Sequence, residues 1–218
     1  MTVAPRREDE SLAVVDDIKT AGGDAIFVQT DVPIEAACEE MVAKTLEAFG
    51  RLDCAFNNAG RGGGGNTANC DFDAWNEVLA VNMTGTVMSM KYEVRPMLEQ
   101  GGGAIVNNAS VLGLIGMPGG AAYVGSKHGV VGLTKSAALE FADKNIRVNS
   151  VCPGYTLTDL TASTLNDPAK REKAMEKTPM GRHAEPEEIA ATVLWLCGEG
   201  ASFITGQAIA PDGGWSTW

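Results

Sequence analysis

A tyrosine and a lysine four positions apart are the residues of this chain best suited to acid/base chemistry. Tyr123 and Lys127 fall in an apolar stretch, residues 121 to about 142, that predicts a long helix, so their side chains share one helical face. A nearby ammonium favours the phenolate and lowers the tyrosine pKa from ~10 toward neutral pH, where proton transfer is most effective. The pair alone decides little, because such pairs also occur on solvated helix faces.

A serine supplies a third group of the right type. Ser110 follows an apolar run at residues 104–109, which predicts a strand whose carboxyl end presents a hydroxyl donor. Alone, this serine is equally consistent with a local turn hydroxyl.

Strand-like and helix-like segments alternate along the chain and would position these groups. Repeated alternation predicts one α/β domain over residues 1–218, a doubly wound, Rossmann-like parallel sheet with helices on both faces. The expected strands cover residues 2–4, 25–28, 52–57, 104–108, 147–152 and 207–210. The expected helices cover residues 8–21, 38–49, 71 to about 99, 121 to about 142 and 186–197.

Polar residues collect where these strands end. Sheets of this kind bind ligands outside the carboxyl ends of their strands. Asn, Asp, Gly and Pro are also ordinary turn formers. Because four such clusters share the edge that carries Ser110 and Tyr123, a binding site is the better interpretation. The clusters are Asp31, residues 57–60, Ser110 and residues 153–154.

Composition narrows the function classes. The net charge of -11 argues against nucleic acid or an anionic membrane as a general partner. The chain has five cysteines without a C-x-x-C spacing and only two histidines, so it offers few ligands for a zinc site. Reduced, buried thiols in a cytoplasmic protein are therefore expected. No apolar run has the length of a signal or membrane segment.

In their order and spacing, these residues resemble the short-chain dehydrogenase/reductase family. The resemblance implies that Tyr123 is the general acid/base, that Lys127 binds the nicotinamide ribose and lowers the tyrosine pKa, and that Ser110 hydrogen-bonds the substrate oxygen. Asn82 would anchor a water that relays protons. The motifs that carry the resemblance are residues 58–60, Asn82 in N-M-T-G, Ser110, residues 123–127, residues 153–154 with Thr158, residues 205–207 and residues 212–214.

The same resemblance implies a cofactor cleft. Asp31 and Val32 would flank the adenine, and the turn Asn58, Ala59 and Gly60 would line the cleft. Pro153 and Gly154 would border it, and the backbone of Thr156 together with Thr158 would meet the nicotinamide carboxamide.

One expected motif is missing. A literal G-x-G-x-x-G occurs at Gly60, Gly62 and Gly65, but no acidic residue follows at ~20 positions and the next helix is expected only near Asp71, so it is rejected as the phosphate loop. Residues 62–65 are instead expected to form a flexible loop at the cleft edge. If Arg6 or Arg7 occupies the ribose-recognition position, the true Gly-rich loop lies before Met1. The chain is therefore expected to lack an amino-terminal β-α unit of ~30 residues, whose strand would lie between strands 25–28 and 52–57.

Two arginines bear on cofactor choice. A carboxylate at this position accepts a hydrogen bond from the ribose 2′-OH of NAD, whereas arginine pairs with the 2′-phosphate of NADP. Arg6 and Arg7 therefore favour NADP(H) over NAD(H). The alternative is that they are solvated charges at a helix start.

The substrate is expected to be a small secondary alcohol or its ketone. Val111, Leu112, Met117 and Tyr155 predict an apolar pocket, covered by a lid at residues 155 to about 179. Phe203, Trp215 and Trp218 near the chain end predict a homo-oligomer, a dimer or tetramer. Two alternatives stay open: a non-catalytic, oligomer-forming relative or inactive fragment, and a dehalogenase-like relative. Lys127 argues against the latter, for which arginine is expected.

Overall fold

Strands and helices alternate along the computed structural model, which describes residues 1–63 and 65–217. All strand pairs are parallel, so the predicted α/β fold class is confirmed. The strands are β1 (Thr2–Val3), β2 (Ile26–Phe27), β3 (Cys54–Asn57), β4 (Gly103–Asn108), β5 (Ile146–Val151) and β6 (Ala208–Ile209). The α-helices are α1 (Glu8–Thr20), α2 (Glu35–Phe49), α3 (Phe72–Leu79), α4 (Gly85–Gln100), α5 (Ala121–Phe141), α6 (Ala162–Leu165), α7 (Pro168–Met175) and α8 (Pro186–Cys197).

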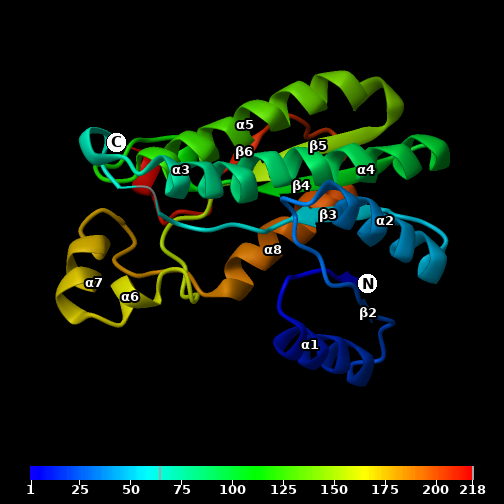
Figure 1. Cartoon of the computed structure of the whole chain (residues 1–218), viewed down its shortest axis with the longest axis horizontal. Helices are drawn as coiled ribbons and strands as arrows, with labels where there is room; N and C mark the ends of the chain where they lie inside the picture. The colour runs from blue at the N-terminus through cyan, green and yellow to red at the C-terminus, as the bar shows by residue number, and fades with distance from the viewer. Residues whose placement is uncertain (64, 218) are drawn as a thin grey trace.

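The main sheet is covered on both faces. Its strand order is β3-β4-β5-β6, with α4 and α5 on one face and α8 on the other (Figure 1). Successive side chains of a strand point to opposite faces. Ile105 accordingly packs in the cluster that includes Met97 of α4, while its neighbour Val106 packs against Leu196 of α8. Both strand residues are fully buried, which explains the continuous apolar run in the sequence.

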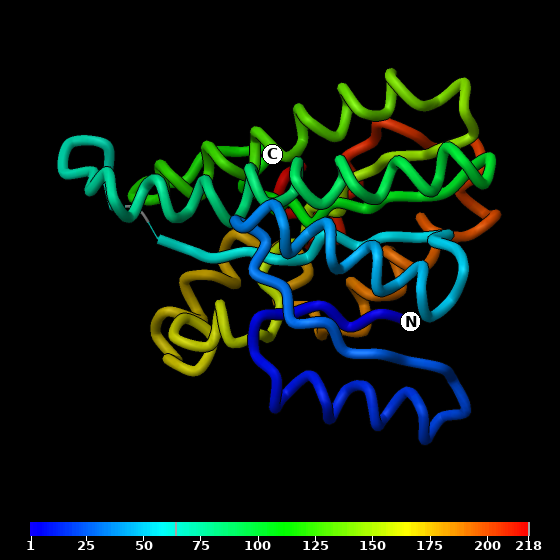
Figure 2. The backbone as a smooth tube through the Cα atoms, turned by 45° about the vertical axis from the view of Figure 1, so that its right-hand side comes forward, coloured from blue at the N-terminus to red at the C-terminus, as the bar shows by residue number. Residues whose placement is uncertain are grey.

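A second, two-stranded sheet consists of β1 and β2. Among the described residues no ladder joins it to the main sheet. In both Figure 1 and Figure 2, β1 lies between β2 and β3, so β1 faces the main sheet. The expectation that the strand at residues 25–28 would flank β3 across a gap is therefore wrong. Of the two strands of the smaller sheet, β1 at the start of the chain is the nearer to β3 (Figure 1).

The long helix predicted for residues 71–99 is interrupted. A single π-helical turn, Ala80–Thr84, separates α3 from α4. Gly85 follows at once, and a Cβ at this position would lie 2.6 Å from Cγ2 of Val32. Glycine therefore permits the loop after β2 to pack on the start of α4. Single π turns inside helices are frequent at functional sites, and sequence periodicity does not reveal them.

Two predicted helix boundaries are confirmed. Gly50 ends α2 in the left-handed conformation, with φ of 74°, which glycine adopts without steric cost. Pro186 opens α8, where Glu185 and Glu188 form a reciprocal capping box. Local signals of this kind need no knowledge of the tertiary structure.

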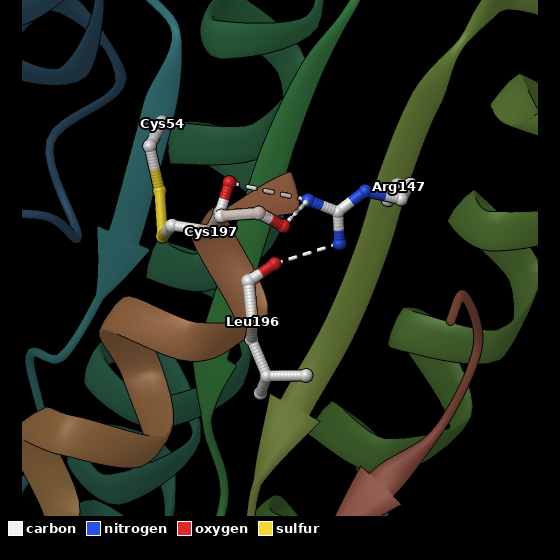
Figure 3. The surroundings of a disulfide bond; sticks show 5 residues. Cys54, Arg147, Leu196 and Cys197 are labelled. Carbon is white, nitrogen blue, oxygen red and sulfur yellow. Dashed lines mark hydrogen bonds between the residues drawn. A yellow bond between two sulfur atoms is a disulfide. The ribbon is translucent and has the colours of Figure 1, made fainter. Parts of the chain in front are cut away.

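The expectation that all cysteines are reduced is wrong for one pair. Cys54 at the start of β3 forms a disulfide with Cys197 at the end of α8, with 5.9 Å between their Cα atoms (Figure 3). The two residues are 143 positions apart, so only the packing of α8 across the sheet brings them together. Cys38, Cys70 and Cys152 are free thiols.

None of the helices in the described part of the chain combines the length and the apolar character needed to cross a bilayer.

Candidate active site

The first turns of α5 carry the tyrosine and the lysine. Lys127 is only 3% exposed, and its Nζ atom donates a hydrogen bond of 2.7 Å to the backbone carbonyl of Asn108, the last residue of β4. The same Nζ atom lies 5.6 Å from the centroid of the Tyr123 ring. The helix thus brings a cation and a phenol together at the carboxyl end of the central strand.

Burial dominates the ionisation of this pair. Removing the ammonium from water lowers the pKa of Lys127 to about 8. Burial raises the pKa of Tyr123, and a hydrogen bond with the Ser110 side chain opposes that rise. The pKa of Tyr123 was expected to fall because of Lys127. In the structure the lowering influence on that pKa is Ser110, and the pKa as a whole is raised.

Ser110 sits directly after β4 and is buried. Its hydroxyl accepts a hydrogen bond of 3.1 Å from the backbone N–H of Leu112 and caps the short 3₁₀ turn that follows. The backbone N–H of Val111 donates to the carbonyl of Pro153 at 2.9 Å. The ends of β4 and β5 are thereby joined, and the serine is fixed beside the tyrosine.

Asn82 lies in the π turn and is 1% exposed. Its Oδ1 atom accepts from the backbone N–H of Arg61 at 2.8 Å. Its Nδ2 group donates to the carbonyl of Arg61 and to the Ser126 hydroxyl, both at 3.0 Å. Asn82 therefore lies next to α5, and its side chain is held by direct protein contacts, while its part in a proton relay stays a prediction.

Ser126 was not singled out from the sequence. Besides accepting from Asn82, its hydroxyl donates to the backbone carbonyl of Tyr123 at 2.8 Å. It therefore links the π turn to α5. Its place one residue before Lys127 on a buried helical face was the available signal.

The turn after β3 approaches Lys127 and Asn82. A Cβ on Gly60 would lie 3.5 Å from Nζ of Lys127 and 3.6 Å from Oδ1 of Asn82, so the glycine leaves open space beside both groups. Asn58 and Ala59 are exposed next to it. These residues fit a bound dinucleotide, because exposed backbone and a buried cation converge on one cradle.

Asn108 is a second residue missed from the sequence. Its Nδ2 group donates to Oδ1 of Asn58 at 2.7 Å, and its own Oδ1 atom is buried without a hydrogen-bond partner within the described residues. A buried amide oxygen normally has a partner. This free acceptor also fits a ligand that carries hydroxyl groups.

The loop after β5 packs closely against the turn after β6. A Cβ on Gly154 would lie 2.9 Å from Cα of Asp212, so only glycine fits against the turn after β6. Thr156 is buried and pairs with Ala184 in an isolated parallel bridge, while Thr158 is exposed. The predicted residues Pro153, Gly154, Thr156 and Thr158 thus lie in the segment that follows the carboxyl end of β5.

The remaining predicted cofactor residues belong to the two-stranded sheet. Arg6 and Arg7 follow β1 and are exposed. Arg7 pairs with Glu10 at 3.1 Å and with Asp159 of the predicted lid at 3.6 Å. Asp31 and Val32 follow β2 and are half-buried, with Val32 packed on α4. The ion pair between Arg7 and Asp159 links the segment after β1 to the predicted lid.

An apolar wall adjoins Tyr123. The rings of Tyr155 and Trp215 stack with centroids 4.8 Å apart and planes 9° from parallel. Their cluster also contains the predicted pocket residues Val111, Leu112 and Met117. Trp215 was expected to be buried against a neighbouring subunit, but its own chain buries it. The second tryptophan of that prediction, Trp218, lies outside the described residues.

The rejected glycine pattern does not open a helix. The α-helix that follows Gly60, Gly62 and Gly65 begins only at Phe72, so no helix amino terminus is formed by these glycines. The expected loop at residues 62–65 lies partly outside the described residues.

A family model and curated proteins match nearly the whole chain. The model described as enoyl-(acyl carrier protein) reductase matches residues 2–216. The cyclohexanol dehydrogenase of Acinetobacter sp. (strain SE19) is 42% identical over 205 residues, covering 94% of this chain and 80% of that protein. The 2,5-dichloro-2,5-cyclohexadiene-1,4-diol dehydrogenase of Sphingobium indicum (strain B90A) is 39% identical over 219 residues, covering 99% of this chain and 86% of that protein.

Solved structures have the same fold. Levodione reductase superposes with a TM-score of 0.94 at 32% identity, covering 99% of this chain and 87% of that structure. A gluconate 5-dehydrogenase from Burkholderia cenocepacia J2315, crystallised with NADP and tartrate, has a TM-score of 0.94 at 26% identity, covering 100% of this chain and 85% of that structure.

Proposed function

Because the chain belongs to the short-chain dehydrogenase/reductase family and is an oxidoreductase, we propose that it interconverts a secondary alcohol and its ketone with a nicotinamide cofactor. The observation that carries the proposal is the buried Lys127 ammonium, which lies 5.6 Å from the centroid of the Tyr123 ring, with the buried Ser110 hydroxyl influencing the pKa of that tyrosine. These three groups can hold one substrate oxygen and exchange a proton with it.

Each side chain has a separate part in the proposed reaction. The bound nicotinamide supplies or accepts the hydride. In ketone reduction Tyr123 donates its phenolic proton to the carbonyl oxygen as negative charge develops there, and Ser110 donates a hydrogen bond to the same oxygen. Lys127 binds the ribose and favours the resulting phenolate. In alcohol oxidation the phenolate of Tyr123 takes the hydroxyl proton. Asn82, fixed by Arg61 and Ser126, positions the proton path behind Lys127.

Replacing the proposed acid/base residue tests this mechanism. Tyr123→Phe should lower kcat by at least ~10²-fold while changing cofactor affinity little, because Lys127 is retained. Tyr92→Phe is the matched control, since Tyr92 is buried in another cluster, where its hydroxyl donates to Glu35. If Tyr123→Phe keeps more than about a tenth of kcat while Tyr92→Phe behaves as wild type, Tyr123 is not the acid/base.

The substrate we propose is uncharged and largely apolar. The support is the wall of Val111, Leu112, Met117, Tyr155 and Trp215 beside Tyr123. Stacked aromatic rings present a flat apolar surface, which suits a compact ring. Two of the relatives are named for cyclic alcohols, so cyclohexanol and related cyclic ketones are the first compounds to assay.

The cofactor we propose is NADP(H) in preference to NAD(H). The support is the pair of exposed arginines after β1, where a carboxylate would favour the 2′-hydroxyl of NAD. The gluconate 5-dehydrogenase of the same fold was crystallised with NADP.

We further propose that the edges of β1 and β3 receive an additional parallel strand, followed by a Gly-rich turn that binds the cofactor pyrophosphate. The support is the division between the two sheets among the described residues. Strand edges without a partner leave backbone groups to be satisfied by water or by another segment. Arg6, Arg7 and Lys127 alone cannot reproduce the row of N–H donors at a helix amino terminus.

The divided sheet also favours a second candidate, a non-catalytic relative that binds no nucleotide. Titrating residues 1–218 with NADPH by fluorescence, beside a fusion that adds a Gly-rich β-α unit of the family, separates the two. The proposed enzyme predicts weak binding by the former and micromolar binding by the fusion. Failure of both would support the non-catalytic alternative, and micromolar binding by residues 1–218 alone would show that the extra strand is dispensable.

A homo-oligomer is the proposed assembly. The support is Phe203, whose side chain is fully exposed, together with Leu194 of α8, which is 72% exposed. Each is a large apolar side chain that contact with a second subunit would remove from water.

A further inference from the structure

The disulfide fixes the end of α8 to the edge strand of the main sheet. Besides the bond from Cys197 to Cys54, the guanidinium of Arg147 on β5 donates to the carbonyls of Leu196, Cys197 and Gly198 at 2.6, 3.2 and 3.3 Å (Figure 3). These carbonyls are the acceptors that a helix leaves unsatisfied at its carboxyl end. One covalent link and one polar link therefore hold the same helix terminus.

A cavity lies beside one of the two cysteines of the disulfide. It has a volume of about 350 Å³ and is lined by Cys197 together with residues 101–104, Arg51 and Arg147, but not by Cys54. This is within the range of cavities that hold small ligands. Two arginines and two acids, Asp53 and Glu199, line it, so neutral and anionic molecules can both enter. The cavity adjoins the amino ends of β4 and β5, opposite the edge that carries Ser110.

We propose that Cys54–Cys197 is a reversible thiol–disulfide exchange site for low-molecular-weight thiols, and that the incoming thiolate attacks Sγ of Cys197. A bond forms between the thiol and Cys197 while the disulfide breaks and Cys54 leaves as the thiolate. A second thiol then attacks the mixed disulfide, releasing Cys197 as a thiolate and the small molecule as its own disulfide. Two electrons pass from two thiols to the protein.

The exchange changes how α8 is held. In the dithiol state its carboxyl end loses the covalent link and is held by the hydrogen bonds from Arg147 and by the packing of Leu196 against the sheet. The cross-link closes a long loop, which restricts the unfolded chain, so the oxidised protein should be the more stable form. This site is independent of the proposed oxidoreductase activity, because none of its residues belongs to the proposed active site.

Counting thiols tests the redox state directly. The folded protein is equilibrated with oxidised or reduced glutathione, then denatured and alkylated, and the labelled cysteines are identified by mass spectrometry. We expect Cys38, Cys70 and Cys152 to be labelled after oxidation, and Cys54 and Cys197 in addition after reduction. Labelling of both Cys54 and Cys197 after oxidation, or of neither after reduction, would overturn the proposal.

The position of attack is tested with single variants. In a Cys70→Ser background, which removes a partly exposed thiol, Cys54→Ser should acquire one glutathionyl group on Cys197 when oxidised glutathione is added. Cys197→Ser should be modified at Cys54 at least about tenfold more slowly, because access controls the exchange rate. Equal rates, or faster modification of Cys54, would contradict attack at Cys197.

A stability measurement separates a working cross-link from an inert one. Reduction should lower the Tm of the Cys70→Ser protein by at least about 4 °C. The variant that also carries Cys54→Ser and Cys197→Ser should show no redox-dependent change in Tm. An unchanged Tm in the parent, or the same change in both proteins, would overturn the stabilising role.

Discussion

Tyr123 and Lys127 owe their chemistry to burial as much as to their spacing. The lysine charge is stabilised by a single carbonyl, that of Asn108, and its pKa falls to about 8. The tyrosine pKa is raised by burial, with Ser110 opposing the rise. At neutral pH the phenol is therefore protonated and ready to donate, while the ammonium is largely charged. This combination suits ketone reduction at neutral pH.

The two directions of the reaction should depend on pH in opposite ways. Because the pKa of Tyr123 is raised, alcohol oxidation, which needs the phenolate, should increase by up to about tenfold per pH unit toward alkaline pH. Ketone reduction, which needs the phenol, should hold through neutral pH and decline on the alkaline side. Profiles of kcat/KM from pH 6 to 10 test this. Ser110→Ala should move both limbs to higher pH, whereas oxidation that slows as the pH rises would contradict the assignment.

Cofactor preference is the second prediction at the level of single residues. Replacing Arg6 and Arg7 with Ala should reduce the preference for NADP over NAD by about ten- to a hundredfold in kcat/KM, the scale of a charge-assisted pair with phosphate. Arg6 should contribute more, because Arg7 is already paired with Glu10 and Asp159. Lys19→Ala removes an exposed cation from α1 and serves as control. Equal use of both cofactors before and after the change would leave the arginines as surface charges.

At the level of elements, the π turn and its contacts determine the geometry of the site. The extra residue of the π turn places Asn82 where its amide meets both Arg61 and Ser126. Directly beyond it, α4 places the carboxylate of Glu93 inside the protein, where it accepts a hydrogen bond of 3.0 Å from Nδ2 of Asn57 on β3. Helix α4 therefore begins directly after the π turn, and further along it carries a buried acid against the edge strand β3.

Glu93 should make stability depend on pH. Desolvation raises its pKa from 4.5 to about 7, so the contribution of this group to stability is fully present below pH 4.5 and is lost as the pH rises through 7. The loss amounts to about 3 kcal/mol across that window. Urea unfolding of Glu93→Gln at pH 5 and 8 should show a much smaller difference than wild type. Glu99→Gln, an exposed position on α4, should keep the wild-type difference, and an unaltered difference in Glu93→Gln would disprove the assignment.

At the level of the whole molecule, two features bear on further contacts: the division of the strands into two sheets and the exposed apolar side chain of Phe203. The main sheet is closed on both faces by α4, α5 and α8, whereas β1 and β2 form a sheet of their own. Phe203 projects from the loop after α8 with its side chain entirely in solvent. Contact with a second copy of the chain would remove this apolar surface from water.

Self-association should depend on Phe203. Light scattering at micromolar concentration should give a mass that is a multiple of 22.8 kDa for wild type. Phe203→Ser should shift the distribution toward the monomer because it removes apolar area from the contact. Leu12→Ser, at a 43% exposed position on α1, should leave the mass unchanged. A monomeric wild type would disprove the oligomer.

Whether the sequence predicts a structural feature of this protein depends on how far apart in the sequence the contacting residues lie. The shared face of Tyr123 and Lys127, the glycine end of α2 and the proline start of α8 follow from residues a few positions apart, and the structure confirms them. The π turn, the pairing of Cys54 with Cys197 and the burial of Glu93 arise only when distant segments pack. The periodicity of apolar residues reports only local structure, so it cannot predict contacts between segments that are distant in the sequence.

The link between positions 54 and 197 also defines a covalent ring. Asn82, Ser110, Tyr123 and Lys127 all lie between its two ends, and so does the exposed part of the lid at α7. Exposed segments of this kind are where proteases cut first. A single cut in α7 would therefore open the ring without dividing the molecule, and the two pieces would part only after a thiol had broken the bond between them.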